Sequence, residues 1–261
     1  MMKICVLVLC VAFVSSAPQV KENDNDFELP AGTITCQIDS PDRDECIKEA
    51  IQDMLPKLVN GLESLRIPPI DPYRVESQSM TFRRGDAFAA TGTIRKTNIY
   101  GASNAKITDV KTKITKTHIS TQIKAYVPHS TVEGYYKGEG RFNGLKIKSK
   151  GYFNVTATDI NLVSRTEGDI IEVNGKEYVK LTKFEVSPQF GDLKVYATGL
   201  FPDEELSRIT LKFVNQYWPF MVREMMPQVR AAIEPLLIEE ANKFLLHVPI
   251  RKMLYYGEDS A

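Results

Sequence analysis

The side chains that could perform acid–base or nucleophilic chemistry are few and scattered in this sequence. The three histidines, His118, His129 and His247, are far apart in the chain, and none stands beside an obvious nucleophile. There is no G-x-S-x-G elbow, no H-E-x-x-H zinc motif, no Walker A loop and no C-x-x-C pair. We therefore interpret the histidines as surface or satisfied core residues, and we predict no catalytic site, no metal site and no bound cofactor.

The glycines at positions 138, 140 and 144, in the stretch YYKGEGRFNG, match a dinucleotide-binding loop only in part. Such a loop joins a strand to a helix, whereas this stretch lies among strand-forming residues and no helix follows it. We therefore assign these glycines to a β-hairpin.

The first residues have the three parts of an export signal. Lys3 is positively charged, Ile4 to Val14 form an unbroken apolar run, and the small residues Ser15, Ser16 and Ala17 follow. The apolar run is too short to span a bilayer. We expect residues 1–17 to be a secretory signal peptide, and the polar residues 18–30 to form a flexible arm.

Removal of the signal peptide leaves two cysteines, because Cys5 and Cys10 lie within it. Cys36 and Cys46 can then form one disulfide in an oxidising compartment. A metal site is the weaker interpretation, since no histidine pair or second cysteine pair accompanies them. One disulfide cannot hold 261 residues together, so the fold must depend on an apolar core.

The charges balance overall but not locally. The chain has 33 Lys and Arg against 33 Asp and Glu, which gives no case for a nucleic-acid partner. Residues 91 to 150 include twelve basic residues but only three acidic ones, Asp109, Glu133 and Glu139. The basic residues are Arg95, Lys96, Lys106, Lys111, Lys113, Lys116, Lys124, Lys137, Arg141, Lys146, Lys148 and Lys150. A solvated outer sheet face explains such a block, and attraction to an anionic membrane or glycan is the alternative.

A helix, a long series of strands and a second helix follow the arm. Ser40-Pro41 predicts the start of the first helix, which runs to about Gly61 with a kink at Pro56. From Val75 to Phe201, β-branched and aromatic residues dominate and no helical period survives, which predicts an antiparallel meander. No repeat or interdomain linker is visible, so we predict one domain over residues 31–261.

Apolar and polar residues alternate within the meander, which predicts one apolar sheet face. One such set is Ile119, Thr121, Ile123, Ala125 and Val127, and another is Leu145, Ile147, Phe153, Val155 and Ala157. Lys146, Lys148 and Lys150 fall on the opposite face. Asn154, in the sequon Asn154-Val155-Thr156, falls with the lysines, so we expect a surface glycosylation site there. Asn174-Gly175 predicts a tight hairpin.

The last helix predicted from the sequence is unusually long. It begins at Asp203 and ends before His247-Val248-Pro249, which amounts to about ten turns. Pro219, Pro227 and Pro235 must bend or break it. Its apolar stripe comprises Leu206, Ile209, Phe213, Tyr217, Phe220, Met221, Met225, Val229, Ile233, Leu236, Leu237 and Phe244.

A sheet with one apolar face and a long helix with an apolar stripe bury each other. The predicted fold is therefore α+β, with a curved antiparallel sheet around the C-terminal helix. Apolar residues at helical spacing are usually core alone, but two features favour a ligand-binding interior. The stripe is longer than a compact core needs, and the thioethers of Met221, Met225 and Met226 suit an adaptable wall.

Several stretches are distinctive when taken together. They are Cys36 and Cys46 before the first helix, IPPIDPY at 67–73, PHSTVEGYYKGEGRFNGLKIKSKGYFNV at 128–155, NQYWPFMVREMMP at 215–227 and HVPIRKML at 247–254. In this order and spacing they resemble the insect takeout and juvenile-hormone-binding family over essentially the whole mature chain. The resemblance implies a tubular roll, akin to tubular lipid-binding domains, with a buried tunnel for a terpenoid or fatty ligand and no cofactor or turnover.

One departure from the family pattern narrows the resemblance. Haemolymph juvenile-hormone carriers of the family typically have a second disulfide, whereas this chain has no cysteine after Cys46. The sequence is therefore more similar to the takeout branch, whose ligands vary. We expect a secreted monomeric carrier of an isoprenoid or fatty-acyl ligand. The residues expected to line its tunnel are Met54, Leu58, Ile123, Phe153, Val155, Phe213, Tyr217, Phe220, Met221, Met225 and Val229.

Two other classes of function remain as alternatives. A membrane- or glycan-binding protein would use the basic sheet face, and transient membrane or receptor contact would also suit a carrier. A hydrolase of lipophilic esters would need a nucleophile and a base that meet in space, and no motif in the sequence provides them.

Overall fold

The computed structural model describes residues 29–84, 88–142 and 145–257. The predicted signal peptide and residues 18–28 of the predicted arm lie outside these ranges. The helices are α1 (Arg43–Lys57), α2 (Glu204–Gln216), α3 (Trp218–Leu245) and α4 (Ile250–Met253), with 3-10 turns at Glu63–Leu65 and Ala102–Asn104. The strands are β1 (Cys36–Gln37), β2 (Tyr73–Arg84), β3 (Phe88–Tyr100), β4 (Lys106–Ile114), β5 (His118–Phe142), β6 (Leu145–Val173), β7 (Lys176–Gln189), β8 (Asp192–Ala197) and β9 (Leu254–Tyr255).

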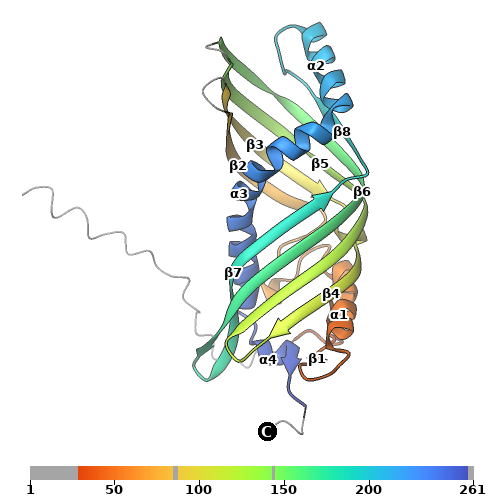
Figure 1. The fold of residues 1–261 in the computed structure, drawn as a ribbon, viewed down its shortest axis with the longest axis vertical. Coiled ribbons are helices and arrows are strands. Elements are labelled where there is room, and N and C mark those ends of the chain that lie inside the picture. Colours follow the sequence, from red (N-terminus) through yellow and green to blue (C-terminus); the bar gives the residue numbers. More distant parts are fainter. Residues whose placement is uncertain (1–28, 85–87, 143–144, 258–261) are drawn as a thin grey trace, which may run out of the picture.

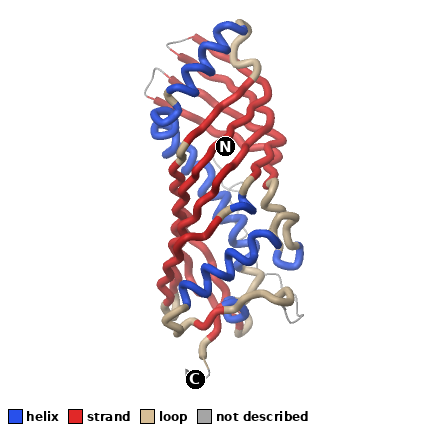
Figure 2. Tube along the Cα trace, turned by 90° about the vertical axis from the view of Figure 1, so that its right-hand side faces the viewer, coloured by secondary structure: helices blue, strands red, loops and turns tan. Residues whose placement is uncertain are grey.

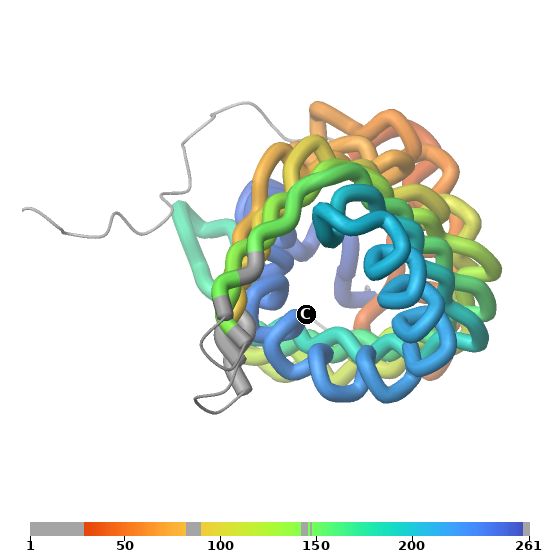
Figure 3. Tube along the Cα trace, turned by 90° about the horizontal axis from the view of Figure 1, so that it is seen from above, coloured from red at the N-terminus to blue at the C-terminus, as the bar shows by residue number. Residues whose placement is uncertain are grey.

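The predicted meander forms one antiparallel sheet of seven strands. Its order is β2-β3-β5-β6-β7, with β4 also paired to β5 and β8 also paired to β6. The two longest strands, β5 and β6, run the length of the molecule, and the sheet curls into a roll (Figures 1 and 3). Helix α3 packs against both β7 and β2, so it fills the gap between the two outer edges of the sheet. The α+β architecture expected from the sequence is confirmed.

The two ends of the roll differ. We call the end with α1, α4, β1 and the C-terminal residues the lower end, and the end with α2 the upper end (Figures 1 and 2). The lower end contains a buried cluster: Val179, Leu181 and Ile250 pack against Leu245 and neighbouring side chains. Val248, with no exposed surface, adds to the packing there. The lower end is therefore closed by side chains.

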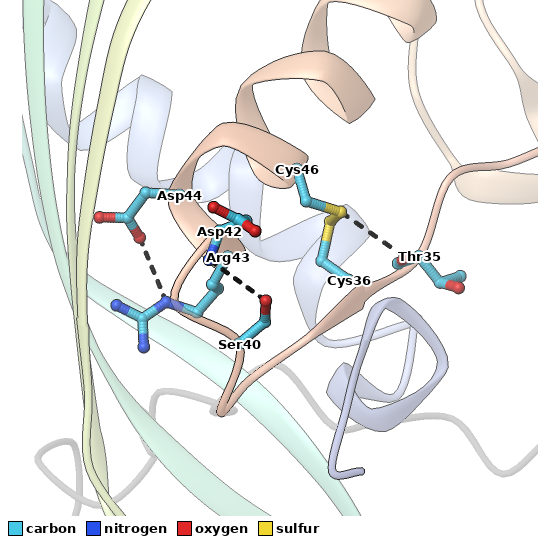
Figure 4. Close-up of a disulfide and its surroundings, with 7 residues drawn as sticks. All are labelled: Thr35, Cys36, Ser40, Asp42, Arg43, Asp44 and Cys46. Carbon is cyan, nitrogen blue, oxygen red and sulfur yellow. Dashed lines mark hydrogen bonds and ion pairs between the residues drawn. A yellow bond between two sulfur atoms is a disulfide. The ribbon is translucent and has the colours of Figure 1, made fainter.

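The disulfide between Cys36 and Cys46 is present and ties β1 to α1 at the lower end (Figure 4). Helix α1 begins at Arg43 with Asp42 at its N-cap, rather than at Ser40, because the Ser40 hydroxyl accepts a hydrogen bond from the Asp42 amide in a preceding turn. Pro56 lies inside the helix, one residue before its end at Lys57, so no helical turn follows the predicted kink.

The predicted C-terminal helix is two helices. Helix α2 ends at Gln216 and α3 begins at Trp218, next to Pro219, which has no amide hydrogen to continue the ladder. Pro227 and Pro235 lie inside α3. The break turns α2 away from α3 and places it at the upper end (Figure 1).

Asparagine side chains fix both helices to strand edges that have no neighbouring strand. The Asn242 side chain of α3 accepts from the Leu181 amide at 2.8 Å and donates to the Leu181 carbonyl at 3.1 Å. The Asn215 side chain of α2 makes the same two bonds with Val195, at 2.7 and 2.8 Å. Each amide therefore replaces a missing neighbouring strand, which also blocks edge-to-edge association.

Helix α1 protects the edge of β4 in the same manner. The Gln52 side chain accepts from the Ile107 amide at 2.8 Å and donates to the Ala105 carbonyl at 3.1 Å. The Asp44 carboxylate accepts from the amide and the hydroxyl of Thr112. Three helices thus dock on three strand edges through polar side chains.

Within β5 and β6, the alternating apolar residues change from odd-numbered to even-numbered positions. On β6 the apolar positions are odd up to Ala157 and even from Ile160, and Asp159 between them has a left-handed φ of 51°. On β5 the change falls at Pro128, at the same level of the sheet. The glycines at 138 and 140 lie within β5 rather than at its turn, since the strand continues to Phe142.

Asp71 provides a testable pH dependence of stability. Its carboxylate accepts from the amides of Gly101 and Ser103 and from the Ser103 hydroxyl. Burial alone would raise the pKa of Asp71, but these hydrogen bonds outweigh it and leave the pKa below its usual value. A lowered pKa stabilises the fold above about pH 4 and loses that effect as the pH falls through the folded-state value.

We therefore expect Asp71→Asn to lower the free energy of unfolding at pH 7, and to match the wild type more closely at pH 3. Urea denaturation at both pH values measures this difference. The matched control is Glu172→Gln, which alters an exposed carboxyl on β6. An equal loss for Asp71→Asn at both pH values would contradict the assignment.

Candidate functional site

Among the described residues, no group of three or more His, Cys, Asp or Glu could hold a metal ion. The His118 ring lies 3.2 Å from Asp169, and the His247 ring lies 3.2 Å from the Ser64 carbonyl. Burial, followed by the charge of Arg66, lowers the pKa of His247. No described helix is long and apolar enough to cross a bilayer.

An apolar row crosses five strands on the inner face of the sheet, from β2 to β8. Tyr73 pairs with Ile99, Ile99 with Val132, Val132 with Val155, and Val155 with Val195. The adjacent residues at the two ends of the row, such as Arg74 and Lys194, are charged and exposed on the outer face. Because side chains directly opposite in a sheet lie side by side, this row is a continuous apolar band.

Helices meet both ends of this band. At its β2 end, burial and then the Glu240 carboxylate of α3 raise the pKa of the Tyr73 phenol, so this ring lies beside α3. At its β8 end, Asn215 fixes α2 to the backbone of Val195. Viewed from above, the strands and the two helices therefore complete a ring (Figure 3).

A second inner band lies in the lower half of the roll. Val110 pairs with Ile123, Ile123 with Ser164, and Ser164 with Val186. Its face is the one that packs on α3, because Ile119 and Ile170 of the same face contact the buried cluster at the lower end. Charged residues such as Lys124 and Arg165 occupy the outer face at this level.

The apolar side chains of the helices are only partly buried. No residue of α1, α2 or α3 is buried. On α2 and the residue that follows it, Leu206, Ile209, Phe213 and Tyr217 remain 46, 54, 50 and 45% exposed. The side chains of the inner bands also remain mostly half-buried. Helical stripes packed tightly on a sheet would be buried, so these apolar surfaces are accessible to a ligand.

The predicted lining residues separate into groups. Ile123, Phe153 and Val155 lie on the inner face of the sheet. Phe213 on α2 and Tyr217 pack their rings 4.7 Å apart. Phe220, Met221, Met225 and Val229 lie on α3, and the Arg223 guanidinium lies over the Phe220 ring.

Met54 in α1 and Leu58 just after it come from the helix that packs on β4 and β1. That helix lies at the lower end, whereas α2, which carries Phe213, lies at the upper end (Figure 1). The lining residues expected from the sequence did not include Tyr73, Ile99, Val132 or Val195. Their alternation with polar neighbours was visible in the sequence, but their alignment into one row depends on strand register.

Comparisons with known proteins agree with this architecture. A family model described as haemolymph juvenile hormone binding protein matches residues 6–255. A protein of Schistocerca gregaria named for beta-carotene binding is 25% identical over 214 residues, which are 81% of this chain and 83% of that protein. The crystal structure of Epiphyas postvittana Takeout 1 superposes with a TM-score of 0.68 at 24% identity, over 85% of this chain and 99% of that one. The last likeness shows the fold.

Proposed function

This chain belongs to the haemolymph juvenile hormone binding protein family, and from that premise we propose that it is a secreted carrier of a small isoprenoid or fatty-acyl ligand. The observation that carries the proposal is the unburied apolar stripe of α2 and α3 opposite the apolar inner face of the sheet. The ligand would occupy an internal tunnel between them. The proposal includes no enzymatic turnover.

The driving force is the removal of hydrocarbon surface from water, which contributes about 25 cal/mol per Å² of buried apolar area. Two continuous inner bands in a long roll suit an elongated chain better than a compact ring system. Juvenile-hormone-like terpenoids, other isoprenoids and fatty-acyl compounds share this shape. The name of the Schistocerca gregaria relative is consistent with an isoprenoid cargo.

Titration with an apolar fluorescent probe, 1-N-phenylnaphthylamine, tests the proposal. We expect saturable enhancement of its fluorescence, and displacement by methyl farnesoate or palmitic acid but not by glucose. The same mixture, analysed for hydrolysis of methyl farnesoate, separates a carrier from an esterase. Absence of saturable probe uptake by the folded protein would contradict the proposal.

Export and glycosylation form part of the same proposal. Asn154 lies on the outer face, opposite Glu133 on β5 and Tyr196 on β8, so a glycan there would not enter the interior. The docked edges of β4, β7 and β8 support a monomer. Secretion from insect cells with a mass decrease on glycosidase treatment tests the first two points, and light scattering tests the third.

A second candidate activity is docking to an anionic membrane by the upper outer face. Lys137 pairs with Lys150, Arg141 with Lys146, and Glu139 with Lys148. All of these side chains are exposed, and Glu139 is the only acid among them. Glu139 makes ion pairs with Lys137 and Lys148, so the patch retains a net positive charge.

We expect replacement of Lys146, Lys148 and Lys150 by glutamine to weaken binding to phosphatidylserine vesicles by about 100-fold at low salt, since each basic residue contributes about 1 kcal/mol. Vesicle sedimentation measures this effect, with heparin–agarose retention as the arm for a glycan. The control variant replaces Lys111 and Lys113 on β4. Equal binding of all variants to phosphatidylserine would exclude this face.

A further inference from the structure

Three hydroxyl side chains lie together on the inner face in the lower half of the roll. Thr121 on β5 is directly opposite Thr166 on β6, and Ser164 lies two residues before Thr166 on the same face of β6. Strand geometry places their Cβ atoms within about 5 to 8 Å of one another. They form a compact group rather than scattered polar positions.

The wall around this group is apolar. Ile119 and Ile123 flank Thr121 along β5. On the other side, Thr166 is opposite Phe184 and Ser164 is opposite Val186, both on β7. The hydroxyl group is therefore a polar spot in an otherwise apolar band.

These three hydroxyls have no partner among the described residues. Within the described part of the chain, the side chains of Thr121, Ser164 and Thr166 make no hydrogen bond, and all three are half-buried. Thr112, their neighbour in the same row, differs: its hydroxyl donates to the Asp44 carboxylate at 2.5 Å, and the residue is buried. Of these four hydroxyls, only that of Thr112 thus makes a hydrogen bond to another described residue.

The three hydroxyls also remain accessible. The buried, unpartnered polar side-chain atoms of the described residues are Thr97 Oγ1, Arg230 Nε and Arg251 Nη1. The three hydroxyl oxygens are not among them, so each still reaches space that a water molecule could enter. A ligand in the interior could reach them as well.

We propose that Thr121, Ser164 and Thr166 form a polar subsite that binds the hydrogen-bond-accepting oxygen of an otherwise hydrocarbon ligand, such as an ester or ketone carbonyl or an epoxide. This inference rests on the carrier function proposed above and adds the chemical class and orientation of the cargo. The oxygen-bearing end of the ligand lies in the lower half, towards the closed end, and the hydrocarbon runs towards α2.

The subsite would favour an oxygen-bearing ligand over a pure hydrocarbon because covering an unpaired hydroxyl costs free energy. A pure hydrocarbon would displace water from these groups without replacing its hydrogen bonds, whereas an ester carbonyl accepts one or two bonds. The net value of such bonds corresponds to about tenfold in affinity.

The test compares methyl laurate with pentadecane, which have equal numbers of heavy atoms, by displacement of 1-N-phenylnaphthylamine. The variant Thr121→Val, Ser164→Ala, Thr166→Val removes the hydroxyls with little change in shape. We expect it to bind methyl laurate about tenfold more weakly than the wild type and to bind pentadecane equally well or better. The matched control is Ser120→Ala, on the outer face between Ile119 and Thr121.

A second measurement uses the wild-type protein alone. The infrared carbonyl band of ¹³C-carbonyl methyl laurate should shift to lower frequency when bound, relative to its position in hexane. An unshifted band, or an ester affinity unchanged in the variant, would overturn the subsite and leave the carrier function intact. Failure of both ligands to displace the probe from the wild type would overturn the carrier function and the subsite with it.

Discussion

Replacing Val132 with tryptophan should reduce affinity for hydrophobic ligands by roughly 10- to 100-fold while leaving the fold nearly as stable as the wild type. Val132 occupies the middle of the inner band that runs from Tyr73 to Val195, between Ile99 and Val155. The indole would enter the space that the ligand needs. Sharing that space would weaken the free energy of ligand binding by about 1 to 3 kcal/mol. Probe titration measures the affinity, and urea denaturation measures the stability.

The ligand affinity and the free energy of unfolding of Val132→Trp together distinguish an open interior from a packed one. If the inner band were packed solid, Val132→Trp would lower the free energy of unfolding by about 1 to 3 kcal/mol. The matched control is Thr131→Trp, which adds the same bulk to the next residue on the outer face, in a row with Tyr100 and Thr156. A destabilised Val132→Trp with normal ligand affinity would contradict the account of the interior.

Replacing Asn242 with alanine should lower the free energy of unfolding by about 2 to 4 kcal/mol. The substitution leaves the amide and the carbonyl of buried Leu181 without partners, and each unpaired buried group costs about 1 to 3 kcal/mol. It also frees α3 from β7, the helix–strand pair that closes the roll. Urea denaturation measures the loss, and hydrogen exchange at the Leu181 amide locates it.

Asn215→Ala is the matched control, because it removes the same pair of bonds at Val195. Val195 is half-buried, so water can replace part of what is lost and the expected effect is about 1 kcal/mol. Asn242→Asp keeps an acceptor for the Leu181 amide and should fall between the wild type and alanine. Equal stabilities of Asn242→Ala and the wild type would show that α3 is fixed by apolar contacts alone.

The local elements of this fold could be predicted where one residue type dictates the backbone. Asn174 and Gly175 both have positive φ, 53° and 73°, in the hairpin between β6 and β7. Such a turn suits Asn-Gly in particular, so its sequence signal is strong. The break in the C-terminal helix next to Pro219 has an equally local cause.

The arrangement of the wall could not be predicted from such local signals. At Pro128 and Asp159 the apolar residues change from odd-numbered to even-numbered positions. This change decides which residues of β5 and β6 face inward over half their length, and neither residue alone predicts it. The docking of Asn242 and Asn215 joins residues far apart in sequence, and both amides have the appearance of ordinary polar positions on a helix. Alternation thus identified Ile123 and Val155, but tertiary register was needed to find Val132.

The most direct test of the central claim is native mass spectrometry of the secreted protein, with organic extraction and identification of any bound small molecule. We expect one hydrophobic molecule per chain, released by solvent, with an isoprenoid or fatty-acyl skeleton that carries an oxygen acceptor. A folded protein that emerges without a ligand, and then takes up neither 1-N-phenylnaphthylamine nor methyl farnesoate, would contradict it.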